Sequence, residues 1–126
     1  MMNSAMTEEA LKWLENLVDE LSAHPYYAKS GEEVLMRVAA EIRLLAPHLR
    51  TAALQALVKW LESGDEYKFH AALSLIELLN AGELVPQIRQ LVRNAQAGQV
   101  HLPRGWLESA EQTLLRLSEA PCREVV

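Results

Sequence analysis

The stretch SGDEYKFHAALSLIELLNAGELVPQI, residues 63–88, decides the fold class of this chain. Gly64 occupies the position of a left-handed helix cap, and Asp65 can cap the helix that follows. Asn80-Ala81-Gly82 closes that helix, and Pro86 is tolerated in the first turn of the next, where its missing N–H costs no hydrogen bond. The stretch therefore predicts two helices joined by a short break. The inward-facing residues of the first are Phe69, Ala72, Leu73, Ile76 and Leu79.

Two amphipathic helices are predicted toward the amino terminus. Thr7 precedes the first, and His24-Pro25 ends it, because the residue before a proline is pushed out of helical geometry. Ser30 and Glu33 form a capping box for the second, which runs to about Leu45.

Prolines mark the start of two further helices, one on each side of residues 63–88. Pro47 suits the first turn of one, and Pro103 opens the last helix, which runs roughly to Ser118. No segment alternates with the period of a strand, so we expect an all-α protein of about six antiparallel helices. We expect one domain over residues 1–126, with an ordered core at about 7–118 and a loosely held tail at 119–126. The apolar stripe of the helix after Pro47 is Leu49, Ala53, Ala56, Leu57, Trp60 and Leu61.

The amino-acid composition disfavours several classes of function for this chain. Half of the 126 residues are hydrophobic and the formal net charge is −5. The first 46 residues hold eight acids and four bases, which disfavours binding to a phosphate backbone. The single cysteine, Cys122, excludes both an intrachain disulfide and a cysteine-based metal site. With no apolar run of membrane-spanning length, we expect a soluble, cytoplasmic protein.

A pattern recurs over residues 47–95. A helix ends in the Gly64-Asp65 turn, the next carries the pair Ala71-Ala72 followed by Leu73, and a short turn leads to Val85-Pro86-Gln87-Ile88. This pattern resembles the HEAT-like repeat family. The resemblance implies a short right-handed α-α superhelix of three hairpins, whose second helices form a concave surface for binding macromolecules. A closed helical bundle is the structural alternative, and it would bring the first and last helices together.

The resemblance also implies which side chains face a partner. On the concave face we expect Arg37, Glu41, His70, Ser74 and Glu77, with Glu111 and Gln112 at its edge. Tyr26 and Tyr27 stand in the loop between the first two helices, where an amphipathic ring is a good interface anchor. Packing against the first helix is the competing interpretation for these rings.

A reactive site is not expected. His70 lies one turn after Glu66, a spacing that allows a shared metal or proton. A solvated helix face is the better interpretation, because a metal site normally needs three or four converging ligands. No phosphate loop or nucleophile elbow is present. We therefore predict no catalytic residue, no metal and no cofactor.

The sequence favours a non-catalytic protein–protein interaction module, such as an adaptor or an immunity-type inhibitor that covers a basic toxin. The alternative is a nucleic-acid-binding repeat protein that uses the basic patch Arg89, Arg93 and Arg104. A further alternative is a homodimer or larger homo-oligomer, because a stack of three hairpins has two open ends to cover.

Overall fold

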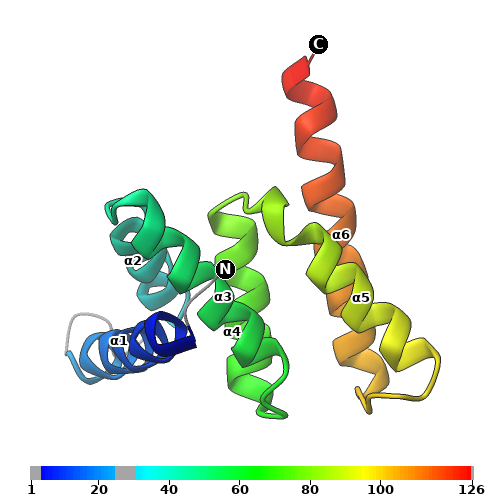
Figure 1. The fold of residues 1–126 in the computed structure, drawn as a ribbon, viewed down its shortest axis with the longest axis horizontal. Helices are drawn as coiled ribbons and strands as arrows, with labels where there is room; N and C mark the ends of the chain where they lie inside the picture. Colours follow the sequence, from blue (N-terminus) through cyan, green and yellow to red (C-terminus); the bar gives the residue numbers. More distant parts are fainter. Residues whose placement is uncertain (1–3, 25–30, 126) are drawn as a thin grey trace.

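The computed structural model describes residues 4–24 and 31–125. Within these ranges the chain is all-α, as predicted, with six α-helices, one short 3-10 turn and no strand (Figure 1). The elements are α1 (Ser4–Ala23), α2 (Gly31–Arg43), α3 (Pro47–Leu61), α4 (Glu66–Leu78), the 3-10 turn η2 (Gly82–Leu84), α5 (Val85–Gln96) and α6 (Arg104–Val125).

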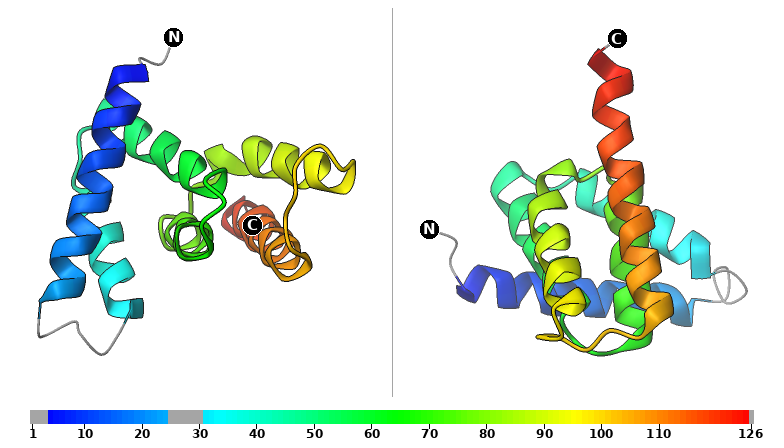
Figure 2. Two further views of the ribbon diagram at one scale, coloured as in Figure 1. Left: turned by 90° about the horizontal axis from the view of Figure 1, so that it is seen from below. Right: turned by 90° about the vertical axis from the view of Figure 1, so that its right-hand side faces the viewer.

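Each helix packs on helices one or two places away along the chain. α1 packs on α2 and α3, α3 on α4, and α5 on α6, while α4 also packs on α2 and α6. In the left view of Figure 2, α3 and α5 lie in one row, and α4 and α6 lie in a second row beneath them. α1 and α6, which a closed bundle would bring together, lie at opposite ends of the array (Figure 1). The handedness of the stack and its membership of the HEAT-like family remain predictions.

The breaks between helices have the predicted backbone geometry in most places. Gly64 and Gly98 have φ of 80°, the left-handed conformation in which glycine has no steric penalty. The Asp65 carboxylate accepts a hydrogen bond of 2.8 Å from the backbone N–H of Lys68 and so caps α4. After α4 the left-handed residue is Asn80, with φ of 50°, which is the other residue type that tolerates this conformation.

The core runs through both rows of helices. The predicted inward residues of α4 are buried, and so are Val34, Val38 and Ile42 of α2, whereas Leu45, also predicted to face inward, is half-buried beyond the end of α2. The Phe69 ring stacks on Trp106 of α6 with centroids 4.9 Å apart. Leu49 was wrongly predicted to be in the core. Its side chain is 43% exposed because the first turns of α3 border an open groove instead of another helix.

Three predicted helix ends differ from the structure. α1 begins at Ser4, so Thr7 is a buried residue within the helix and not its cap; Ala5 and Met6 are good helix formers. α2 ends at Arg43, slightly before Leu45. α6 continues past Ser118 to Val125, although the apolar pattern ends at the buried Leu117. The loosely held tail stays a prediction, and Ser30 of the predicted capping box lies outside the described residues.

Candidate functional site

α2 packs on α4, beside the row of α4 and α6, and an open hollow lies between α2 and α4. Two of the predicted partner-facing residues, Ser74 and Glu77, line it together with Leu78 of α4. Glu32 and Leu35 line it from α2. Leu78 is 37% exposed, so the hollow combines an accessible apolar side chain with two carboxylates.

Glu77 also holds α4 to α6. Its carboxylate accepts a hydrogen bond of 2.5 Å from the Thr113 hydroxyl and one of 2.7 Å from the Arg116 guanidinium. Thr113 is 1% exposed, so its hydroxyl depends on this one acceptor among the described residues. Glu77 is therefore a structural link as well as a surface group. On the other side of α4, the Arg43 guanidinium of α2 donates to the Leu78 carbonyl.

Arg37 and Glu41 lie apart from the hollow. They form an i, i+4 ion pair of 3.1 Å along α2, and neither lines the space between α2 and α4. At the edge of the same row, Glu111 accepts a hydrogen bond of 3.4 Å from Gln96, and Gln112 is exposed. The structure thus brings Ser74 and Glu77 into one hollow without Arg37 and Glu41.

His70 has a packing role in the structure. Its Nδ1 donates to the Glu66 carbonyl at 3.0 Å, so the contact one turn back is to the backbone and not to the carboxylate. The ring also meets Trp106 edge-on, with centroids 5.8 Å apart. In the described parts of the chain, no group of three His, Cys, Asp or Glu side chains is placed to hold a metal ion.

The predicted basic patch is partly neutralised. The Arg104 Nε lies 3.2 Å from a Glu108 carboxylate oxygen, one turn further along α6. Arg89 and Arg93 are exposed on α5. This leaves two arginines on α5 as the cationic part of the patch. Tyr26 and Tyr27, the proposed interface anchors, lie outside the described residues.

Polar contacts tie the first row together between α3 and the start of α5. Arg50 lies 2.7 Å from the Glu83 carboxylate, and this hydrogen bond lowers the pKa of Glu83 more than burial raises it. The side-chain amides of Gln55 and Gln87 donate to each other, at 3.3 Å and 3.1 Å. These contacts fix α5 against α3 at the surface.

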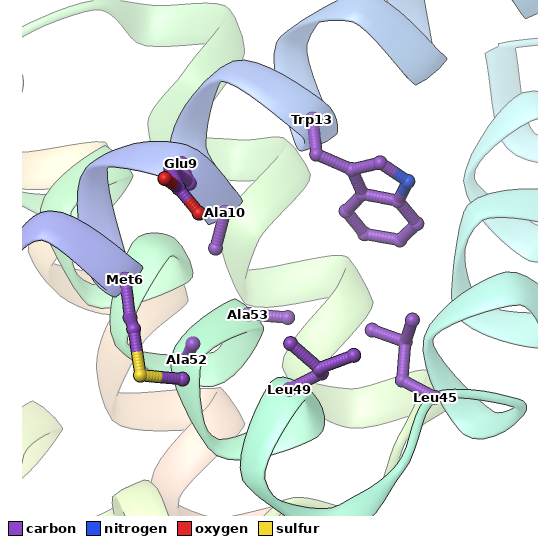
Figure 3. A pocket seen from close by; sticks show the side chains of 8 residues that line it. All are labelled: Met6, Glu9, Ala10, Trp13, Leu45, Leu49, Ala52 and Ala53. Carbon is purple, nitrogen blue, oxygen red and sulfur yellow. The ribbon is translucent and has the colours of Figure 1, made fainter.

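A second hollow, between α1 and α3, was missed by the sequence analysis (Figure 3). It is an open groove of about 380 Å³. The sequence did not indicate this groove for two reasons. Met6 lies before the predicted start of the first helix, and Leu49 belongs to an apolar stripe that was expected to be covered. Its lining residues are Met6, Glu9, Ala10 and Trp13 of α1, Leu45 of the α2–α3 connection, and Leu49, Ala52 and Ala53 of α3.

A third, smaller hollow lies where α1 meets α3 and α4. The buried Trp60 indole N–H has no hydrogen-bond partner among the described residues, and Trp60 lines this hollow. Lys68 and Glu15 form an ion pair of 3.0 Å at its edge. Burial, and then the negative charge of Asp19, raises the pKa of Tyr67 beside it. The Lys68–Glu15 ion pair joins α4 to α1.

No model of a known protein family matches the chain, and no curated protein or solved structure shows significant similarity to it. Of the helices in the described ranges, none has both the length and the apolar character to cross a membrane.

Proposed function

We propose that this chain is a non-catalytic protein-binding module, a HEAT-like stack of three hairpins that binds a partner protein with a basic surface in the cytoplasm. The observation that carries the proposal is the hollow between α2 and α4, where the exposed Leu78 stands beside Glu32 and Glu77.

The lining of this hollow has the composition of an interface centre with a polar edge. Leu35 and Leu78 supply the apolar part, and Ser74 supplies a small hydrogen-bonding group. Nearby on α2, Met36 is 52% exposed. Protein interfaces are rich in methionine, whose flexible side chain adapts to a partner.

Charge favours a basic partner. The net charge is −5, and the charged residues that line the hollow are Glu32 and Glu77. Glu77 is paired with Arg116, so Glu32 carries most of the negative charge there. Complementary charge speeds encounter and excludes acidic competitors, even where each surface pair adds little affinity. A catalytic role has less support, because Glu77 is held by Thr113 and Arg116 and the His70 ring is packed on Trp106.

The test places a photo-cross-linking amino acid at Ser74, in the hollow, and in a control chain at Gln99, an exposed residue of the α5–α6 turn. We expect a discrete protein adduct from the Ser74 chain in the native cell and none from the Gln99 chain. The captured protein is then purified, and its affinity is measured for Glu32→Lys and for Glu62→Lys, an exposed control at the end of α3.

Glu32→Lys is expected to lower this affinity severalfold, while Glu62→Lys leaves it unchanged. Charge reversal at Glu77 is a poor test, because it would also break the link between α4 and α6. The same adducts at Ser74 and Gln99, or no effect of Glu32→Lys, would contradict the proposal.

A further inference from the structure

The groove between α1 and α3 shares no lining residue with the hollow between α2 and α4. We infer that this groove binds a short amphipathic helix that carries lysine or arginine beside its apolar stripe. The inference rests on the proposed function only in that its occupant is a segment of a protein.

The groove residues of α1 are spaced as residues on one face of a helix, which is the arrangement that a second helix can pack against. On α1, Met6, Glu9, Ala10 and Trp13 stand at i, i+3, i+4 and i+7, so they form one strip along the helix. From Met6 to Trp13 this strip is about 10 Å long at about 1.5 Å per residue. That length matches two turns of a bound helix, and such helices place residues of the same spacing into a groove.

The opposite wall is equally apolar. Leu45 and Leu49 face Trp13 across the groove in Figure 3, and Met6 points toward Ala52. Ala10, Ala52 and Ala53 make the floor, and their small side chains leave room for a large apolar side chain from the occupant. Burial of such a side chain against Leu49, which is itself accessible, supplies the driving force.

Charge selects among possible occupants. Glu9 is the only charged residue among those lining the groove, and α1 as a whole carries five acids and one base. A cationic edge on the occupant therefore meets a negative wall. A second copy of this chain fits less well, because a symmetric contact would place one acidic α1 against another.

The experiment uses the full chain and two synthetic helical peptides. Both carry leucines at i, i+3, i+4 and i+7; one has lysines beside the leucine stripe and the other has glutamates. Binding is followed through the indole N–H resonance of Trp13, assigned with Trp13→Phe. We expect the lysine peptide to bind and shift this resonance, and the glutamate peptide to bind about tenfold more weakly.

Single-residue variants test whether the lysine peptide binds in the groove between α1 and α3. Leu49→Ser removes an accessible leucine of the groove, and Leu115→Ser removes one on α6 that is 63% exposed. The first is expected to weaken binding of the lysine peptide about tenfold and the second to leave it unchanged. Glu9→Gln is expected to weaken it about threefold. Circular dichroism of each variant confirms that it remains folded.

Three outcomes would overturn the inference: equal binding of the two peptides, no weakening by Leu49→Ser, or resonance shifts that map away from Trp13. A concentration-dependent dimer that Leu49→Ser abolishes, measured by sedimentation, would instead assign the groove to a second copy. The cross-linking result at Ser74 is independent of all these outcomes, because that residue lies in the other hollow. A negative result for peptide binding in the groove is therefore distinguishable from a negative result for partner binding at the hollow between α2 and α4.

Discussion

At the scale of single residues, the polar contacts do more to join helices than to build reactive groups. Glu77 receives both the Thr113 hydroxyl and the Arg116 guanidinium, and so connects α4 to α6. A hydrogen bond to a charged group is worth about 1.5–3 kcal/mol, above the value for a neutral pair. Arg50 and Glu83 make a similar but more exposed connection between α3 and the start of α5.

Thr113→Val tests the first connection. Valine keeps the shape of the buried threonine but removes the hydroxyl that Glu77 accepts, so we expect the free energy of unfolding to fall by about 1–2 kcal/mol. Urea denaturation measures the change. The matched control is Thr51→Val, at an exposed threonine that bonds only to the Pro47 carbonyl, where the change should stay within about 0.5 kcal/mol. Equal losses in the two variants would contradict the role of Glu77.

Glu83→Gln tests the second connection through its pH dependence. The hydrogen bond from Arg50 lowers the pKa of Glu83 below its ordinary value of 4.5. Because the folded-state pKa is the lower one, the stabilisation is complete above the unfolded-state pKa and is lost as the pH falls through the folded-state pKa. Both side chains are partly exposed, so solvent screening limits the effect to about 0.2–1 kcal/mol.

We therefore expect Glu83→Gln to lower the free energy of unfolding at about pH 7 and to lower it less at about pH 3. Urea denaturation of both proteins at each pH checks this. The control, Glu62→Gln at the exposed end of α3, should show no such dependence. A loss of the same size at both pH values would show that the ion pair does not stabilise the fold.

At the scale of elements, the turns decide where each helix stops and the next begins. Gly64 separates α3 from α4 with φ of 80°, in open space where an added methyl group meets no neighbour. The cost of replacing it is therefore conformational and not steric crowding by the rest of the fold. Asp65 follows at once and caps α4, so these two residues complete the four-residue connection 62–65.

Gly64→Ala is expected to lower the free energy of unfolding by about 1–2 kcal/mol, because an L-residue is disfavoured in the left-handed conformation. Gly105→Ala is the matched control: this glycine stands within α6, also in open space, without a positive φ. There alanine should stabilise the protein by about 0.5–1 kcal/mol. Thermal unfolding of both variants gives the sign of each stability change. A change of the same sign in both would show that the left-handed backbone at Gly64 does not require glycine.

The sequence predicted these elements well because turn and cap residues act locally. Gly64, Asp65 and Pro47 each specify a backbone geometry within a few residues. Helix ends without such residues were placed less well, as the extension of α6 past Ser118 shows. Leu49 was misassigned because a periodic pattern identifies an apolar face without telling whether another helix covers it.

At the scale of the whole molecule, the two hollows lie between helices that pack on each other, α2 and α4 for one and α1 and α3 for the other. The sequence predicted Ser74 and Glu77 as surface groups, and they line one hollow. The groove between α1 and α3 depends on how far apart those two helices stand. No periodic pattern within one helix contains that information.

In this fold α1 and α6 lie apart, at opposite ends of the helix array. Pulsed electron paramagnetic resonance measures their separation, with spin labels on the exposed Asn16 of α1 and Gln112 of α6 after Cys122→Ser removes the single cysteine. Packed helices have axes about 8–10 Å apart, and two packing steps, α1 to α4 and α4 to α6, separate α1 from α6. A distance distribution centred beyond about 20 Å is the predicted result. A distribution centred near about 10 Å, the spacing of helices in direct contact, would show a closed bundle and contradict the account.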